Sequence, residues 1–80
     1  MAEGEESSSS FLLIPHAGRR IRELGVSIQD VEFVLEQGTF LGHSRSSGRE
    51  LWQAEVRRRR IIVVVEPDTN PQVVVTVVAP

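Results

Sequence analysis

The sequence predicts an α+β domain in which two N-terminal helices pack on a four-stranded antiparallel sheet. Apolar residues recur at helical spacing over residues 15–38. β-branched runs replace this pattern from residue 61 onward, and short turns separate the extended segments. A chain of 80 residues without an internal repeat is long enough for one domain, which we place at residues 11–80.

Residues 1–10 (MAEGEESSSS) contain no side chain that could anchor them in a core, and they are acidic and serine-rich. This composition predicts a disordered tail and is unlike a secretory signal. No apolar run approaches the roughly 20 residues of a membrane helix. We therefore expect a cytoplasmic protein without a membrane partner.

The first helix is predicted over residues 16–24. Ala17, Ile21 and Leu24 form one apolar stripe, Pro15 suits the first helical turn, and Gly25 suits the position after the last turn. Before it, residues 11–14 form a short apolar run that fits either a first short strand or the lead into the helix.

The second helix is predicted over residues 28–37. Ser27 followed three residues later by Asp30 resembles a capping box, and Gly38 ends the apolar stripe. Four strands are then expected at residues 39–45, 50–56, 61–66 and 72–78. Because short turns join them, we expect an antiparallel meander with helices on one face.

All nine basic residues are arginine. The formal net charge is −2, but three of the eleven acidic residues lie in the N-terminal segment. Residues 11–80 therefore carry nine arginines against eight acids. Arginine matches phosphate and carboxylate geometry, although a genome that favours arginine over lysine codons explains the same composition.

Common cofactor and catalytic motifs are absent from the sequence. There is no glycine-rich phosphate loop, no cysteine, and no serine, histidine and aspartate order typical of a hydrolase triad. His16 and His43, with acids scattered elsewhere, do not form a metal-ligand pattern. We therefore expect neither a cofactor nor a metal.

His16 and Arg20 are the first candidate site residues. They are four residues apart on the first predicted helix and so project from the same side. A neighbouring arginine disfavours the protonated imidazole, which suits a base near neutral pH. The structural alternative is a helix-start histidine that hydrogen-bonds a strand carbonyl.

The run from Arg57 to Arg60 is the second candidate. In a tight hairpin, alternation sends Arg57 and Arg59 to one face and Arg58 and Arg60 to the other. One pair could then face a phosphate, whereas a short basic run is commonly just a solvated turn.

Two further residues have alternative roles. Thr76 is the one polar residue of the run VVVTVVA, and a threonine in a strand is most often a β-branched filler. Trp52 fits a core anchor under the helices, with exposed stacking on a base as the other option.

Residues 15–38 (PHAGRRIRELGVSIQDVEFVLEQG) resemble the opening of the DUF4258 family, and VVVTVV at 73–78 is similar to its closing strand. The family's loose helical pattern is H-A-x-x-R-x-x-E-R-G-[IV]-S-x-x-D-V-E-x-x-L-x-x-G. Val78 stands where the family usually has tyrosine. The family is similar to RelE-like toxins, which implies two helices on a four-stranded antiparallel sheet.

The resemblance also implies metal-independent cleavage of RNA, in which a 2′-hydroxyl attacks the adjacent phosphate. Carried over by position, His16, Arg20 and Thr76 match site positions, and an arginine such as Arg57 or Arg60 faces the phosphate. RNA and an antitoxin or regulatory protein are the implied partners. The alternatives are a non-catalytic module that binds RNA or protein, and a domain that self-associates through its valine-rich edge.

Overall fold

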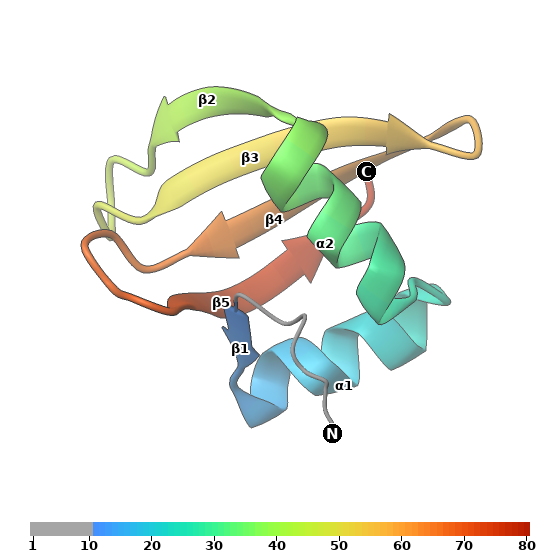
Figure 1. Ribbon diagram of the computed structural model, residues 1–80, viewed down its shortest axis with the longest axis horizontal. Helices are drawn as coiled ribbons and strands as arrows, with labels where there is room; N and C mark the ends of the chain where they lie inside the picture. Colours follow the sequence, from blue (N-terminus) through green and yellow to red (C-terminus); the bar gives the residue numbers. More distant parts are fainter. Residues whose placement is uncertain (1–10) are drawn as a thin grey trace, which may run out of the picture.

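The structure is a computed structural model that describes residues 11–80, so the predicted tail at residues 1–10 lies outside the described residues. Two helices accompany a five-stranded mixed sheet (Figure 1). The elements in chain order are β1 (Phe11–Leu13), α1 (Pro15–Leu24), α2 (Ile28–Gln37), β2 (Thr39–His43), β3 (Glu50–Val56), β4 (Arg59–Val65) and β5 (Gln72–Val78).

Both helices begin and end where the sequence predicts, with Pro15 added at the start of α1. Pro15 occupies the first turn, and Gly25 ends α1 in the left-handed conformation at φ 71°. Ser27 Oγ accepts from the Asp30 backbone N–H at 3.1 Å, and Asp30 Oδ2 accepts from the Ser27 N–H at 3.1 Å. The capping box at the start of α2 is therefore confirmed.

The sheet has one strand more than predicted. Its order is β1-β5-β4-β3-β2, and β2 to β5 form the expected antiparallel meander. The extra strand, β1, pairs in parallel with β5, with Phe11 opposite Gln72 and Leu13 opposite Val74. The prediction of a four-stranded antiparallel sheet is therefore wrong, although a first short strand was one of the two alternatives for residues 11–14. Three residues give no readable periodicity, and their partner lies at the other end of the chain.

Three strand boundaries also differ from the prediction. β2 ends at His43 and not at residue 45, and β4 begins at Arg59 and not at Ile61. β4 also ends one residue early, at Val65. β4 begins earlier than predicted because only Arg57 and Arg58 form the turn between β3 and β4. Arg59 and Arg60 therefore belong to the strand.

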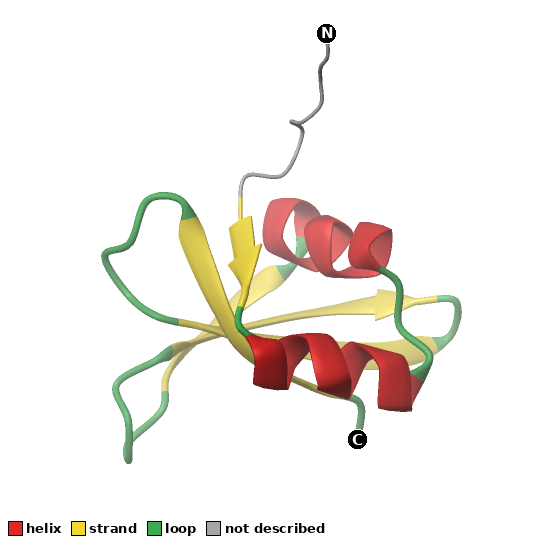
Figure 2. Cartoon of the chain, turned by 90° about the horizontal axis from the view of Figure 1, so that it is seen from below, coloured by secondary structure: helices red, strands yellow, loops and turns green. Residues whose placement is uncertain are grey.

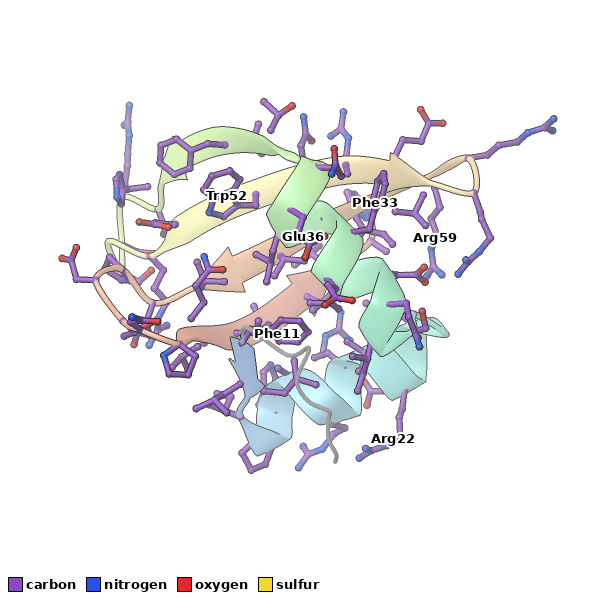
Figure 3. All side chains as sticks on the ribbon, in the orientation of Figure 1. Phe11, Arg22, Phe33, Glu36, Trp52 and Arg59 are labelled. Carbon is purple, nitrogen blue, oxygen red and sulfur yellow. The ribbon has the colours of Figure 1, made fainter. Side chains whose placement is uncertain are left out.

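The helices bury one face of the sheet. α2 lies across β3 and β4, whereas α1 packs against β1 and β5 at the sheet edge (Figures 1 and 2). Alternate residues of β4 and two residues of β5, Val74 and Val77, are fully buried against them, and Figure 3 shows Phe11 close to β5. The buried core comprises Phe11, Ala17, Ile21, Val26, Val31, Val34, Ile61, Val63, Val65, Val74 and Val77.

The sheet face that points away from α2 is called the open face here, and α1 lies at its edge beside β5 (Figure 2). Alternation and register place on it the side chains that lie between the buried positions. A register shift at Val64 and Val65 leaves Val75 as an extra residue, so Thr76 lies opposite Val64 on this face. The open face carries Leu12, Leu51, Gln53, Glu55, Arg60, Ile62, Val64, Val73, Thr76 and Val78.

Neither helix has the length and hydrophobicity that crossing a membrane requires, over the part of the chain that the structure describes.

Candidate functional site

His16 and Thr76 come together although they lie at opposite ends of the described chain. His16 Nε2 and Thr76 Oγ1 are 3.2 Å apart, with the imidazole exposed and the threonine half-buried. The partner is a side-chain hydroxyl, not the strand carbonyl that the structural alternative expected. Thr76 is therefore more than a filler, because it orients the ring of His16.

The short length of β1 permits this contact. β1 pairs with β5 only over Gln72–Val74, so the second half of β5 has no strand on that side. α1 packs beside this part of β5. The first turn of α1 therefore carries His16 to the margin of the open face, next to Thr76.

Arg20 lies one helical turn after His16, on the same flank of α1. Its Nη1 donates to Glu23 Oε1 at 2.9 Å, and the two side chains are 33% and 52% exposed. An ion pair this exposed contributes only about 0–1 kcal/mol to stability. The guanidinium of Arg20 can therefore exchange Glu23 for another anion at low cost.

The four consecutive arginines separate onto two faces, as alternation predicts. Arg57 Nη2 donates to Asp30 Oδ2 of α2, and Arg59 extends beside α2 (Figure 3). Arg58 and Arg60 instead line an open hollow together with residues of β3. The hollow, of about 480 Å³, is lined by Thr39, Gln53, Ala54, Glu55, Arg58 and Arg60.

The hollow and the His16–Thr76 pair are separate. Thr76 lies opposite Val64, and Arg60 precedes Val64 by four residues on the same strand. At about 3.3 Å per residue, the two positions are about 13 Å apart along β4. Of the predicted site residues, His16 and Thr76 meet at one end of the open face, Arg60 lies at the other, and Arg57 lies on the helix side. Arg20 lies on α1, one turn after His16, and pairs with Glu23.

Asp30 is the residue whose wider role the sequence did not reveal. Its side chain is 6% exposed, whereas that of its partner Arg57 is 70% exposed. Burial by itself would raise the pKa of Asp30, but the hydrogen bonds from the Ser27 N–H, Arg57 and Ser27 Oγ outweigh burial and lower it below 3.8. The capping-box pattern identified the contact with Ser27, but nothing in the sequence indicated the contact with Arg57.

A family model described as "Domain of unknown function (DUF4258)" matches residues 13–79. The chain belongs to the DUF4258 family. No curated protein and no solved structure matches it. The match covers His16, Arg20, Thr76 and the whole hollow, so every candidate residue of this DUF4258 chain lies within the family region.

Phe40 and His43 of β2 and Trp52 of β3 form a ring cluster in this DUF4258 domain. The Phe40 ring centroid lies 5.1 Å from that of Trp52 and 5.4 Å from that of His43. Trp52 packs against the core, as predicted, and its Nε1 donates to Glu50 Oε1 at 3.3 Å (Figure 3). Phe40 is 43% exposed, so the outer part of this cluster faces solvent.

Within residues 11–80, no three of the side chains that commonly ligate metals lie together.

Proposed function

We propose that this DUF4258 domain is a small RelE-like endoribonuclease that works without a metal ion. The observation that carries the proposal is the contact between His16 Nε2 and Thr76 Oγ1 at the margin of the open face, with Arg20 on the same flank of α1. These are an exposed imidazole, a hydroxyl that orients it and a nearby guanidinium. Together they provide a base and an anion-binding group without a metal.

In the proposed reaction, the 2′-hydroxyl of RNA attacks the adjacent phosphorus. A bond forms between the 2′-oxygen and phosphorus, and the bond between phosphorus and the 5′-oxygen breaks. His16 takes the proton of the 2′-hydroxyl, and the leaving 5′-oxygen receives a proton from solvent. The products are a 2′,3′-cyclic phosphate and a 5′-hydroxyl.

Arg20 and Thr76 support this step in different ways. Arg20 leaves Glu23 for the phosphate, whose negative charge grows in the transition state. Thr76 holds the imidazole in one orientation, so we treat it as a positioning residue.

A second candidate function is a non-catalytic module that binds RNA or a partner protein, such as an antitoxin, on the same face. The observation that favours it is the separation of about 13 Å along β4 between Arg60 and the His16–Thr76 pair. Phosphate contacts that are spread over a face give affinity without cleavage.

Incubation of purified protein with RNA in the presence of EDTA tests the proposal. We expect cleavage with cyclic phosphate ends, no cleavage of a substrate with 2′-deoxyribose, and a loss of about 10²–10⁴-fold in rate for His16→Ala. His43→Ala is the matched control, because His43 is also exposed but lies on β2. Thr76→Val should reduce the rate less than His16→Ala does.

Two results would contradict catalysis. One is a parent protein that cleaves no RNA. The other is a His16→Ala variant that cleaves as fast as the His43→Ala control, which would identify a contaminating nuclease.

A further inference from the structure

The hairpin between β3 and β4 turns through two arginines with left-handed backbone. The φ angles of Arg57 and Arg58 are 51° and 67°. A two-residue turn in which both central φ angles are positive favours Asn-Gly. Glycine adopts a positive φ without steric cost, whereas a long side chain such as arginine is disfavoured there. Strained residues of this kind persist where the surrounding structure holds them, and they are concentrated at functional sites.

Arg57 has a structural reason to occupy the turn. Its guanidinium donates to Asp30, which is buried and caps α2 through Ser27. This contact ties the tip of the hairpin to α2. The direction in which the next side chain leaves the turn is thereby fixed.

Arg58 has no comparable structural partner. Over residues 11–80, neither Arg58 nor Arg60 forms an ion pair. Both line the hollow on the open face, where Thr39 and Gln53 add polar groups. Glu55 is the one acid there, so two guanidinium groups face one carboxylate.

The surface between the hollow and His16 is apolar. Ile62 and its cross-strand partner Val78 lie on the open face between the levels of Arg60 and Thr76, and Val64 lies opposite Thr76. Partly exposed aliphatic side chains can contact riboses and bases, while charged groups at either end contact phosphates.

We propose that the hollow formed by Arg58 and Arg60 is a phosphate subsite for an RNA strand that extends across the open face from His16. The inference rests on the proposed function, because it assigns the substrate strand a second point of attachment. It makes the hairpin a determinant of substrate length. An RNA too short to span about 13 Å along β4 cannot use the subsite.

Binding of 2′-O-methyl oligonucleotides tests the inference without cleavage. With a ten-nucleotide probe, we expect Arg60→Gln to weaken binding about tenfold and to lower the salt dependence by about one counterion. With a dinucleotide probe, the same variant should bind like the parent. Arg45→Gln is the matched control, because Arg45 is exposed in the loop between β2 and β3.

Arg58→Gly separates a functional role from a structural one. Glycine suits the left-handed turn, so this variant should melt at a higher temperature than the parent. The inference requires that it also binds the ten-nucleotide probe more weakly.

A competition experiment distinguishes a subsite for an RNA strand from a site for free phosphate. Inorganic phosphate, added at equal ionic strength, should displace the probe far less effectively than an unlabelled oligonucleotide does.

The inference is overturned if Arg58→Gly and Arg60→Gln bind the long probe like Arg45→Gln, or if Arg60→Gln weakens the dinucleotide equally. These outcomes are distinct from failure of the proposed function. A parent that never cleaves RNA but loses oligonucleotide affinity in both variants retains the subsite without catalysis. If the parent cleaves RNA and both variants cleave and bind RNA like the parent, the domain is catalytic but has no subsite at Arg58 and Arg60.

Discussion

Asp30 joins the start of α2 to the β3–β4 hairpin through one carboxylate. It accepts from the Ser27 N–H at the start of α2 and from Arg57 at the tip of the β3–β4 hairpin. Because the Arg57 side chain is 70% exposed, the ion pair alone contributes only about 0–1 kcal/mol. Most of the contribution of Asp30 to folding stability therefore comes from its buried hydrogen bond with the backbone at the start of α2.

We expect Asp30→Asn to lower the free energy of unfolding by about 1–2 kcal/mol near neutral pH. Arg57→Gln should lower the free energy of unfolding by less than Asp30→Asn does, because Asp30 then keeps its contacts with Ser27. Glu36→Gln, which changes an exposed carboxylate on α2, should have almost no effect. Urea unfolding followed by Trp52 fluorescence measures all three variants, and equal losses for Asp30→Asn and Glu36→Gln would contradict this role.

The pH dependence of the same variants follows from the lowered pKa of Asp30. Folding lowers this pKa below 3.8, so the ionised carboxylate stabilises the folded state above about pH 4. The stabilisation is lost as the pH falls through the lowered pKa. The difference in unfolding free energy between parent and Asp30→Asn should therefore shrink below pH 4, whereas a constant difference would contradict it.

At the scale of elements, the junction between α2 and β2 depends on one glycine. Gly38 has an ordinary φ of −77°, so its conformation does not require glycine. A Cβ at position 38 would overlap the carbonyl oxygen of Val34 and would lie 2.6 Å from the carbonyl oxygen of Gln53. The missing side chain is what lets α2 turn directly into a strand beside β3.

Gly38→Ala should therefore lower the free energy of unfolding by about 1–3 kcal/mol, because neither carbonyl belongs to a flexible side chain. Gly18→Ala is the matched control. It lies inside α1, its nearest neighbour would be Arg22 Nη1 at 3.8 Å, and alanine there should add about 0.5–1 kcal/mol. Thermal unfolding should move the two variants in opposite directions, and a shared direction would contradict the close approach.

β1 can be tested by comparing two adjacent residues. Phe11 is 5% exposed and belongs to the core, whereas Leu12 is 55% exposed on the open face. Phe11→Ala should cost about 3–5 kcal/mol, and Leu12→Ala less than about 1 kcal/mol. If Phe11→Ala does not fold, Phe11→Leu still tests the position with a smaller loss in the urea midpoint; equal effects at positions 11 and 12 would contradict the fifth strand.

Elements defined by local patterns were predictable, and those defined by distant partners were not. The spacing of Ala17, Ile21 and Leu24, and the pair Ser27 and Asp30, are local signals and predicted both helices. For residues 11–14 the sequence left a short strand and the lead into a helix as alternatives. The pairing of β1 with Gln72–Val74 decides between them, and local patterns cannot show that pairing.

In the candidate site too, features that depend on local sequence were predictable, whereas distances between residues far apart in the chain were not. The expected separation of Arg57 and Arg59 from Arg58 and Arg60 holds, because alternation in β4 places Arg59 and Arg60 on opposite faces and Arg57 pairs with Asp30 on the helix side. The sequence grouped His16, Thr76 and an arginine without showing the distance between them. That distance depends on the register of β4 and β5, which a shift at Val64 and Val65 changes by one residue.

At the scale of the whole molecule, one core connects all the layers. The buried cluster includes residues of β1, both helices, β4 and β5, and Trp52 of β3 packs against it. No group of elements has a core of its own among these residues. The domain should therefore unfold in a single cooperative transition.

Trp52 fluorescence and far-ultraviolet circular dichroism should accordingly give the same urea midpoint. The first reports packing around β3, and the second reports helix and strand content. Midpoints that differ beyond experimental error would indicate that the β2–β3 end opens separately from the helices.

The contact between His16 and Thr76 has a consequence for how the protein is made. A ribosome releases the N-terminal end of a chain first, so α1 and α2 can form while β5 is still being synthesised. A nascent or truncated chain that ends before residue 76 carries His16 without the hydroxyl that orients it. If the domain cuts RNA, the cell that produces it is protected from chains that have not yet reached Thr76, because the site is assembled only after β5 has been synthesised.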